Sequence, residues 1–138
     1  MKLNHYWLLK TEPDEFSWDD LVKEGESVWD GVKNPTALKN LSRMRPGDQV
    51  IIYHTGKEKA AVGLGRVTSE PFPDPVLHDP RRLVVKISPV RKIKPVSLAS
   101  IKASGRFPGW ELVRLPRLSV VPVSREQWEA LIQWGDTV

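Results

Sequence analysis

The feature that most constrains the fold of this chain is the shortness of its apolar segments, which proline, glycine and charged turns interrupt throughout. The 138 residues include 12 prolines and 9 glycines, the residue types that most often mark turns. Between the turns lie short runs rich in β-branched and aromatic residues, a pattern typical of strands. The pattern predicts five or six strands interleaved with short helices, which form a mixed sheet or small barrel of α+β type.

The strands and helices are expected in an interleaved order. The predicted strands are residues 6–10, 28–32, 49–55, 61–68, 82–87 with 90–93, and 118–121. The predicted helices are a short one that starts after Ser17 and ends at Gly25, then residues 35–44, residues 97–103, and a last one that starts after Ser124 and ends at Gly135. Residues 70–82 are expected to form a loop, and Pro89 is expected to cause a bulge or to lie at a sheet edge.

Two helices have side-chain patterns that predict which face is buried. In the helix over residues 35–44, apolar residues recur at spacing three from Leu38 to Met44, and Asn40 is expected to face outward. In the helix after Ser17, Leu21 and Val22 are expected to lie on one apolar face.

The bulk composition indicates one globular domain over residues 1–138, since one core of ordinary size uses about 100 to 150 residues. The net charge is +4 and the sequence pI is about 9.5, which favours a polyanionic partner. Six tryptophans are many for this length, and tryptophan can either anchor a core or stack on a base. Cysteine is absent, which excludes disulfides and thiolate metal sites.

Residues 1–7 lack the apolar stretch of a signal peptide, and no apolar run is long enough to span a bilayer. We therefore expect a cytoplasmic protein that does not enter membranes, and we expect it to be a monomer.

The residues that could perform catalysis or hold a metal do not form a recognisable set. His5, His54 and His78 lack the spacing of metal ligands. The glycines at 63 and 65 do not form a phosphate-binding loop, and close backbone packing or a bulge is the better interpretation. The serines are best explained as helix caps. We expect no metal, no cofactor and no enzymatic activity.

Several polar residues follow apolar runs at predicted strand ends, and aromatic residues are interleaved with them. A slot lined by aromatic rings and a few hydrogen-bonding groups would suit a planar heterocycle. The polar residues are Thr11, Asp30, His54 and Ser119, and the aromatic residues are Trp7, Trp29 and Tyr53.

Five segments, in order along nearly the whole chain, resemble the signature of the EVE domain family. They are residues 6–14 (YWLLKTEPD), 29–34 (WDGVKN), 45–48 (RPGD) with 53–54 (YH), 71–75 (PFPDP) and 117–122 (RLSVVP). The resemblance implies a PUA-like β-barrel with helices on its flank, related to the YTH domains. It also implies a module that reads a modified base, notably cytosine modified at carbon five in DNA.

The resemblance also implies which residues bind the ligand. The pocket carried over from the family is walled by Trp29 and by the turn Lys10, Thr11, Glu12 and Pro13, with Asp30, Val32 and Asn34 nearby and with Tyr53, His54, Leu118 and Ser119 closing it. The chain departs from the commonest family pattern in having Thr11 for serine, Lys33 for arginine, Pro35 for tyrosine and Leu38 for arginine.

The hypothesis that follows is a base-flipping module. It would hold the nucleic-acid backbone through Lys10, Lys33, Arg43, Arg66 or Arg117 and would receive one extruded base in a slot with a basic mouth. Three alternatives stay open. They are an RNA-binding module without preference for a modified base, a nucleotide-processing enzyme that uses Asp30 and His54, and a protein-binding domain with Trp29 in its core.

Overall fold

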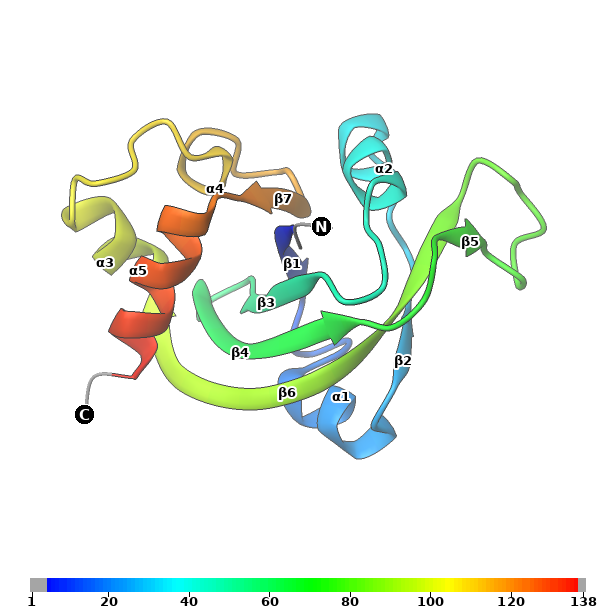
Figure 1. Cartoon of the computed structure of the whole chain (residues 1–138), viewed down its shortest axis with the longest axis horizontal. Coiled ribbons are helices and arrows are strands. Elements are labelled where there is room, and N and C mark those ends of the chain that lie inside the picture. The colour runs from blue at the N-terminus through cyan, green and yellow to red at the C-terminus, as the bar shows by residue number, and fades with distance from the viewer. Residues whose placement is uncertain (1–4, 137–138) are drawn as a thin grey trace.

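The computed structural model describes residues 5–136, which form one curled sheet with helices packed around it (Figure 1). The strands are β1 (Tyr6–Thr11), β2 (Ser27–Trp29), β3 (Gln49–His54), β4 (Ala60–Val67), β5 (Phe72–Pro73), β6 (Leu83–Ser97) and β7 (Val120–Val123). The helices are α1 (Trp18–Glu24), α2 (Pro35–Ser42), α3 (Leu98–Ala103), α4 (Glu111–Arg114) and α5 (Arg125–Gly135). The strand order is β2-β6-β4-β3-β1-β7, with β5 paired to β6. The predicted α+β fold is confirmed.

Strand β6 shapes the sheet, because it is long enough to pair with three other strands along its length. Its residues 83–87 pair with β2 and β5, and residues 87–97 pair with β4 as the strand curves beneath the molecule (Figure 1). The sequence predicts two pieces here, but the structure has one strand of 15 residues. The register with β4 shifts between Leu64 and Gly65, and Gly65 lies opposite Pro89. The bulge predicted at Pro89 therefore lets the strand continue past a residue that cannot donate a backbone hydrogen bond.

Strand β1 lies inside the sheet, parallel to β3 on one side and antiparallel to β7 on the other. Leu8 and Leu9 point to opposite faces, and both are fully buried, as expected for a strand covered on both sides. The parallel pairing places Thr11 opposite His54, and the Lys10 N–H donates to the Ser119 carbonyl at 3.0 Å. Three strand ends that the sequence singled out therefore meet at one edge.

Helices α1, α2, α3 and α5 begin where the sequence predicts, because their caps are local. The sequence does not predict helix α4, and its N-cap residue Trp110 makes no side-chain cap hydrogen bond. Ser17 and Asp20 form a reciprocal capping box at α1, and Ser124 and Gln127 form another at α5. The Asn34 side chain accepts the Ala37 N–H at α2.

Two predictions about helix faces are wrong. Val22 is 51% exposed on α1, and Asn40 is buried, where its side chain donates to the Val120 carbonyl at 2.8 Å. An amide that finds a carbonyl partner can be buried at little cost, so Asn40 ties α2 to β7.

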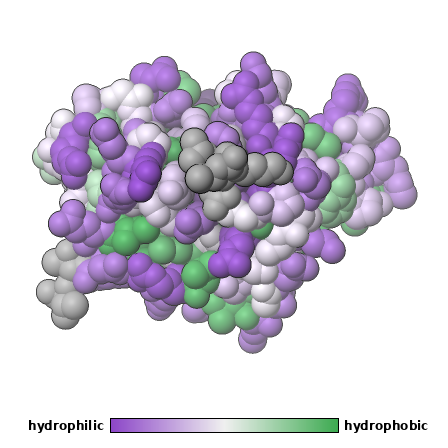
Figure 2. Space-filling view, viewed as in Figure 1, coloured by the Kyte–Doolittle hydropathy of each residue, from purple (hydrophilic) through white to green (hydrophobic). Residues whose placement is uncertain are grey.

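The surface in the view of Figure 2 is mostly hydrophilic, with hydrophobic patches along the lower strands and near α1. Val22 of α1 and Val90 of β6 are among the exposed apolar residues. Within residues 5–136, no helix is both long enough and apolar enough to cross a membrane.

Candidate functional site

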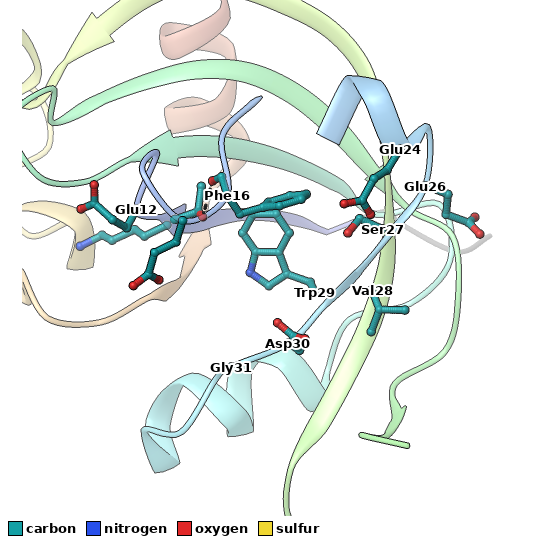
Figure 3. Close-up of a pocket in the computed structure, with 12 residues that line it drawn as sticks. Glu12, Phe16, Glu24, Glu26, Ser27, Val28, Trp29, Asp30 and Gly31 are labelled. Carbon is teal, nitrogen blue, oxygen red and sulfur yellow. Dashed lines mark hydrogen bonds between the residues drawn. The ribbon is translucent and has the colours of Figure 1, made fainter. Parts of the chain in front are cut away.

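A cavity of about 710 Å³ opens beside Trp29, between the end of β1, the turn that follows it, and β2. Figure 3 shows Trp29 pointing from β2 toward the turn that carries Glu12 and Phe16. The residues that line it are Lys10, Thr11, Glu12, Glu15, Phe16, Glu24, Glu26, Ser27, Val28, Trp29, Asp30 and Gly31.

Trp29 and Phe16 form an aromatic corner at the centre of this cavity. Their ring centroids are 5.9 Å apart and their planes meet at 84°. In Figure 3 the indole is seen nearly face-on, and the phenyl ring is nearly edge-on beyond the indole's six-membered ring. The edge of the indole thus points at the face of Phe16, an arrangement that the quadrupoles of the two rings favour. Trp29 is 7% exposed, so it serves both the core and the cavity wall.

The turn that carries Phe16 is held by hydrogen bonds to the end of β1. The Glu15 and Phe16 N–H groups each donate to the Glu12 carbonyl at 2.9 Å. The Thr11 hydroxyl donates to the Phe16 carbonyl at 2.7 Å. The hydroxyl that the family resemblance assigns to the ligand pocket is therefore used to position the aromatic ring next to Trp29.

The cavity lining is acidic, with five carboxylates and one lysine. The predicted basic mouth is therefore wrong for the cavity itself. The Glu12 carboxylate accepts the Thr55 hydroxyl at 3.3 Å, and the Glu26 carboxylate accepts the Thr68 hydroxyl at 2.8 Å. The carboxylate groups of Glu15, Glu24 and Asp30 make no hydrogen bond or ion pair with any other described residue. Their oxygens remain available as acceptors to whatever enters.

Lys10, the one cation of the lining, points along the protein surface. Its Nζ donates to the Pro116 carbonyl at 2.9 Å and lies 5.7 Å from the centre of the Tyr53 ring. Burial lowers the pKa of Lys10 and raises the pKa of Tyr53 to about 12, because removal from water disfavours the charged form of each group.

The structure brings together only part of the predicted pocket. Five of its residues line the cavity: Lys10, Thr11, Glu12, Trp29 and Asp30. The others do not, and most have a structural role instead. Val32, Tyr53 and Leu118 are buried, the Asn34 side chain caps α2, the Ser119 carbonyl binds the Lys10 N–H, and Pro13 lies in the turn without lining the cavity.

His54 is a structural residue. Its Nε2 accepts the Trp18 N–H at 3.0 Å, and its Nδ1 contacts the Glu58 carboxylate. With both ring nitrogens occupied and the side chain buried, His54 is not placed to act with Asp30 as an acid and base pair. Among residues 5–136, no three His, Asp or Glu side chains converge in a way that could hold a metal ion.

The four cations predicted to contact a nucleic-acid backbone are all exposed: Lys33, Arg43, Arg66 and Arg117. None of them forms an ion pair or hydrogen bond with another described side chain. Arg66 lies opposite Gln49, at the end of the β1–β3 ladder that is remote from Thr11. Arg117 follows Pro116, the partner of Lys10, and so lies near the edge where the strand ends meet.

The sequence interpretation missed Phe16, Glu15 and the acidic residues that precede β2. Phe16 stands alone in a polar turn, and one aromatic residue there gives no periodic signal. The only indication would have been its position directly before the helix cap Ser17, where an apolar residue often packs back against the chain.

Comparisons with known proteins agree with this fold. The EVE domain family model matches residues 5–134. Mouse thymocyte nuclear protein 1 is 26% identical over an alignment of 170 positions, gaps included. The alignment covers 98% of this chain and 75% of that protein. The NMR structure of Rpa0253 from Rhodopseudomonas palustris is 36% identical, with a TM-score of 0.90 and coverage of 95% of this chain and 92% of that one.

One solved structure holds a nucleic acid. It is human THYN1 in complex with 5-methylcytosine-containing DNA, with a TM-score of 0.89, 24% identity, and coverage of 98% of this chain and 99% of that one. At this identity the likeness concerns the fold. Because the family model spans residues 5–134, this chain belongs to the EVE domain family.

Proposed function

We propose that this protein binds nucleic acid and takes one extruded base, a modified cytosine in DNA, into the cavity beside Trp29. The observation that carries the proposal is the perpendicular pair of Trp29 and Phe16 in a cavity rimmed by hydrogen-bond acceptors. An aromatic face offers stacking worth about 1 to 3 kcal/mol per base, which offsets the few kcal/mol that base extrusion costs. The DNA complex of human THYN1, which shares the fold, supports the same proposal.

The acidic lining favours a base over a phosphate. Five carboxylates repel a phosphate group, but a carboxylate accepts readily from the exocyclic amine of cytosine. Thymine carries the same 5-methyl group as 5-methylcytosine but has a carbonyl where cytosine has the amine. The unpartnered oxygens of Glu15 and Asp30 therefore favour methylcytosine over thymine. Because the indole is 7% exposed, the side chains that cover it must move before a base can stack on it.

The nucleic-acid backbone must then be held outside the cavity. Lys33 follows the cavity residue Gly31 by two positions, and Arg117 lies near Lys10. Both are exposed and unpaired with described side chains, so both can bind phosphates and release counterions. The binding role that we infer uses no catalytic group, in keeping with the structural part played by His54.

A binding comparison tests the proposal. Fluorescence anisotropy would be measured with DNA duplexes that carry cytosine, 5-methylcytosine or thymine opposite guanine at one position, and with a matched RNA. We expect 5-methylcytosine to bind most tightly, even though the thymine mismatch is the easiest base to extrude. Equal affinity for all three duplexes would contradict the proposal, and tighter binding of the RNA would favour an RNA-binding module.

The backbone contacts have a separate test. We expect Lys33→Ala to weaken binding to every duplex alike and to reduce the slope of log affinity against log salt by about 1. Arg66→Ala, which removes an equally exposed cation at the remote end of the sheet, is the control and should leave both quantities unchanged. If Arg66→Ala weakened binding more than Lys33→Ala does, the DNA would bind at that remote end of the sheet instead.

A further inference from the structure

We propose that Phe16 reads the modification, by packing its ring face against a small apolar substituent at carbon five of the base that stacks on Trp29. This inference rests on the proposed function and adds to it the residue that senses the substituent. It also names the class of substituent, which is methyl in preference to polar or charged groups.

The aromatic corner of Trp29 and Phe16 fixes which ring the edge of a stacked base would meet. A base that stacks on Trp29 lies parallel to the indole, and the Phe16 plane stands at 84° to the indole. The edge of such a base therefore approaches the face of Phe16, as the edge of the indole itself does (Figure 3). The substituents of a pyrimidine project from its edge, so a methyl group directed this way meets an aromatic face.

The other lining residues offer little apolar surface to a methyl group. Three lining side chains are large and apolar: Phe16, Val28 and Trp29. Side chains alternate along a strand, so Val28 points away from Trp29, as Figure 3 shows, and it is 39% exposed. With Trp29 occupied by the base plane, Phe16 is the apolar surface of the described lining that is left for a methyl group.

Phe16 is held in place by the backbone around it. Its carbonyl accepts the Thr11 hydroxyl at 2.7 Å, and its N–H donates to the Glu12 carbonyl at 2.9 Å. Its side chain is half-buried and packs against the core. A side chain positioned in advance loses little conformational entropy on binding, so its contact contributes to selectivity.

These features predict an order of preference among substituents. Methyl gains contact with the phenyl face, whereas a hydroxymethyl group brings a hydroxyl that needs a partner there. A carboxyl group brings a negative charge into a lining that already holds five carboxylates. We expect 5-methylcytosine to bind more tightly than 5-hydroxymethylcytosine, and 5-carboxylcytosine to bind more weakly than cytosine itself.

The variant experiment compares Phe16→Ala with a matched control. Phe107 is also half-buried and also meets a tryptophan edge to face, with centroids 5.9 Å apart and planes at 82° to Trp110. Affinities for the cytosine and 5-methylcytosine duplexes would be measured for both variants. We expect Phe16→Ala to reduce the preference for methylcytosine about fourfold, the effect of one buried methyl group, because it weakens binding of the 5-methylcytosine duplex more than binding of the cytosine duplex. Phe107→Ala should keep the preference intact.

The possible results separate this inference from the proposed function. If wild-type protein shows no preference for methylcytosine over cytosine, the proposed function itself fails. If wild-type protein shows the preference and folded Phe16→Ala keeps it in full, the role of Phe16 fails alone. Phe16→Leu, which keeps apolar volume, covers the case of an unfolded alanine variant and should give an intermediate preference. Tighter binding of 5-carboxylcytosine than of cytosine by the wild-type protein would also overturn the inference.

Discussion

Asp48 is the buried carboxylate that joins the start of β1 to the turn before β3. It is 2% exposed, and its oxygens accept the Trp7 indole N–H at 3.0 Å, the Arg45 N–H at 2.9 Å and the His5 N–H at 3.1 Å. The segment at residues 45–48 does not indicate this network, since two of the donors lie some forty residues earlier, at Trp7 of β1 and at His5 just before it.

We expect Asp48→Ala to lower the free energy of unfolding by about 3 kcal/mol, because buried donors lose a charged acceptor. Urea unfolding followed by far-UV circular dichroism measures the change. Asp19→Ala removes an exposed carboxylate of α1 and should cost less than about 0.5 kcal/mol. Equal costs for the two variants would contradict the importance of the Asp48 network.

The ionisation of Tyr53 makes the free energy of unfolding depend on pH. Burial raises the pKa of this phenol from 10.0 to about 12, so the folded state holds its proton more tightly than the unfolded state does. The stability that Tyr53 contributes is complete below pH 10 and is lost as the pH rises toward about 12. Between pH 9 and 11, the free energy of unfolding in urea should fall more for the wild type than for Tyr53→Phe. An equal fall would show that Tyr53 ionises as freely in the folded state as in the unfolded state.

At the scale of elements, a glycine in β4 makes room for the first residue of α1. A Cβ added at Gly63 would lie 2.4 Å from the Trp18 ring. The sequence interpretation of close backbone packing at this glycine is confirmed, and the register shift between Ala61 and Gly63 accompanies it.

Gly63→Ala should therefore cost about 1 to 3 kcal/mol, the usual penalty of overpacking a core. Thermal or urea unfolding measures it. Gly109→Ala is the matched control, because a Cβ there meets nothing within 4 Å, and its effect should stay within about 0.5 kcal/mol. If Gly63→Ala were as stable as Gly109→Ala, the packing of α1 on β4 would be looser than described.

The elements also show which parts of the fold could be predicted from sequence. The caps at Ser17, Asn34 and Ser124 bond to residues three positions away, so local patterns reveal them. The continuity of β6 through Pro89 depends on its partner Gly65, and the burial of Asn40 depends on the Val120 carbonyl. Both features depend on residues that are distant in the sequence, so no local pattern predicts them.

At the scale of the whole molecule, we propose that residues 1–138 behave as one domain, as the sequence predicts. The core side chains of the described residues form a single cluster that includes Leu8 of β1, Ile51 of β3, Ile87 of β6 and Leu131 of α5. We expect one cooperative thermal transition, with coincident curves from circular dichroism and tryptophan fluorescence and with equal calorimetric and van't Hoff enthalpies. Two separated transitions would contradict a single domain.

Only part of the candidate site could be predicted from the sequence. The ordered blocks of the EVE signature led to Trp29, Asp30 and the turn after β1. The basic net charge of +4 led to the wrong expectation for the cavity, because net charge does not report where carboxylates gather. Glu15 lies in the turn after β1, Glu24 ends α1 and Asp30 follows β2, and the three line one cavity because the fold brings these segments together, which composition cannot reveal.

The central claim, that one extruded base lies in the corner of Trp29 and Phe16, can be measured on the base itself. A DNA duplex with a ¹³C-labelled methyl group on one 5-methylcytosine would be titrated with the protein and followed by NMR. The account predicts that the methyl resonance moves upfield on binding, since it lies over an aromatic face, and that Trp29→Ala abolishes this shift. A methyl resonance that stays at its position in the free duplex while the protein is bound would contradict the account.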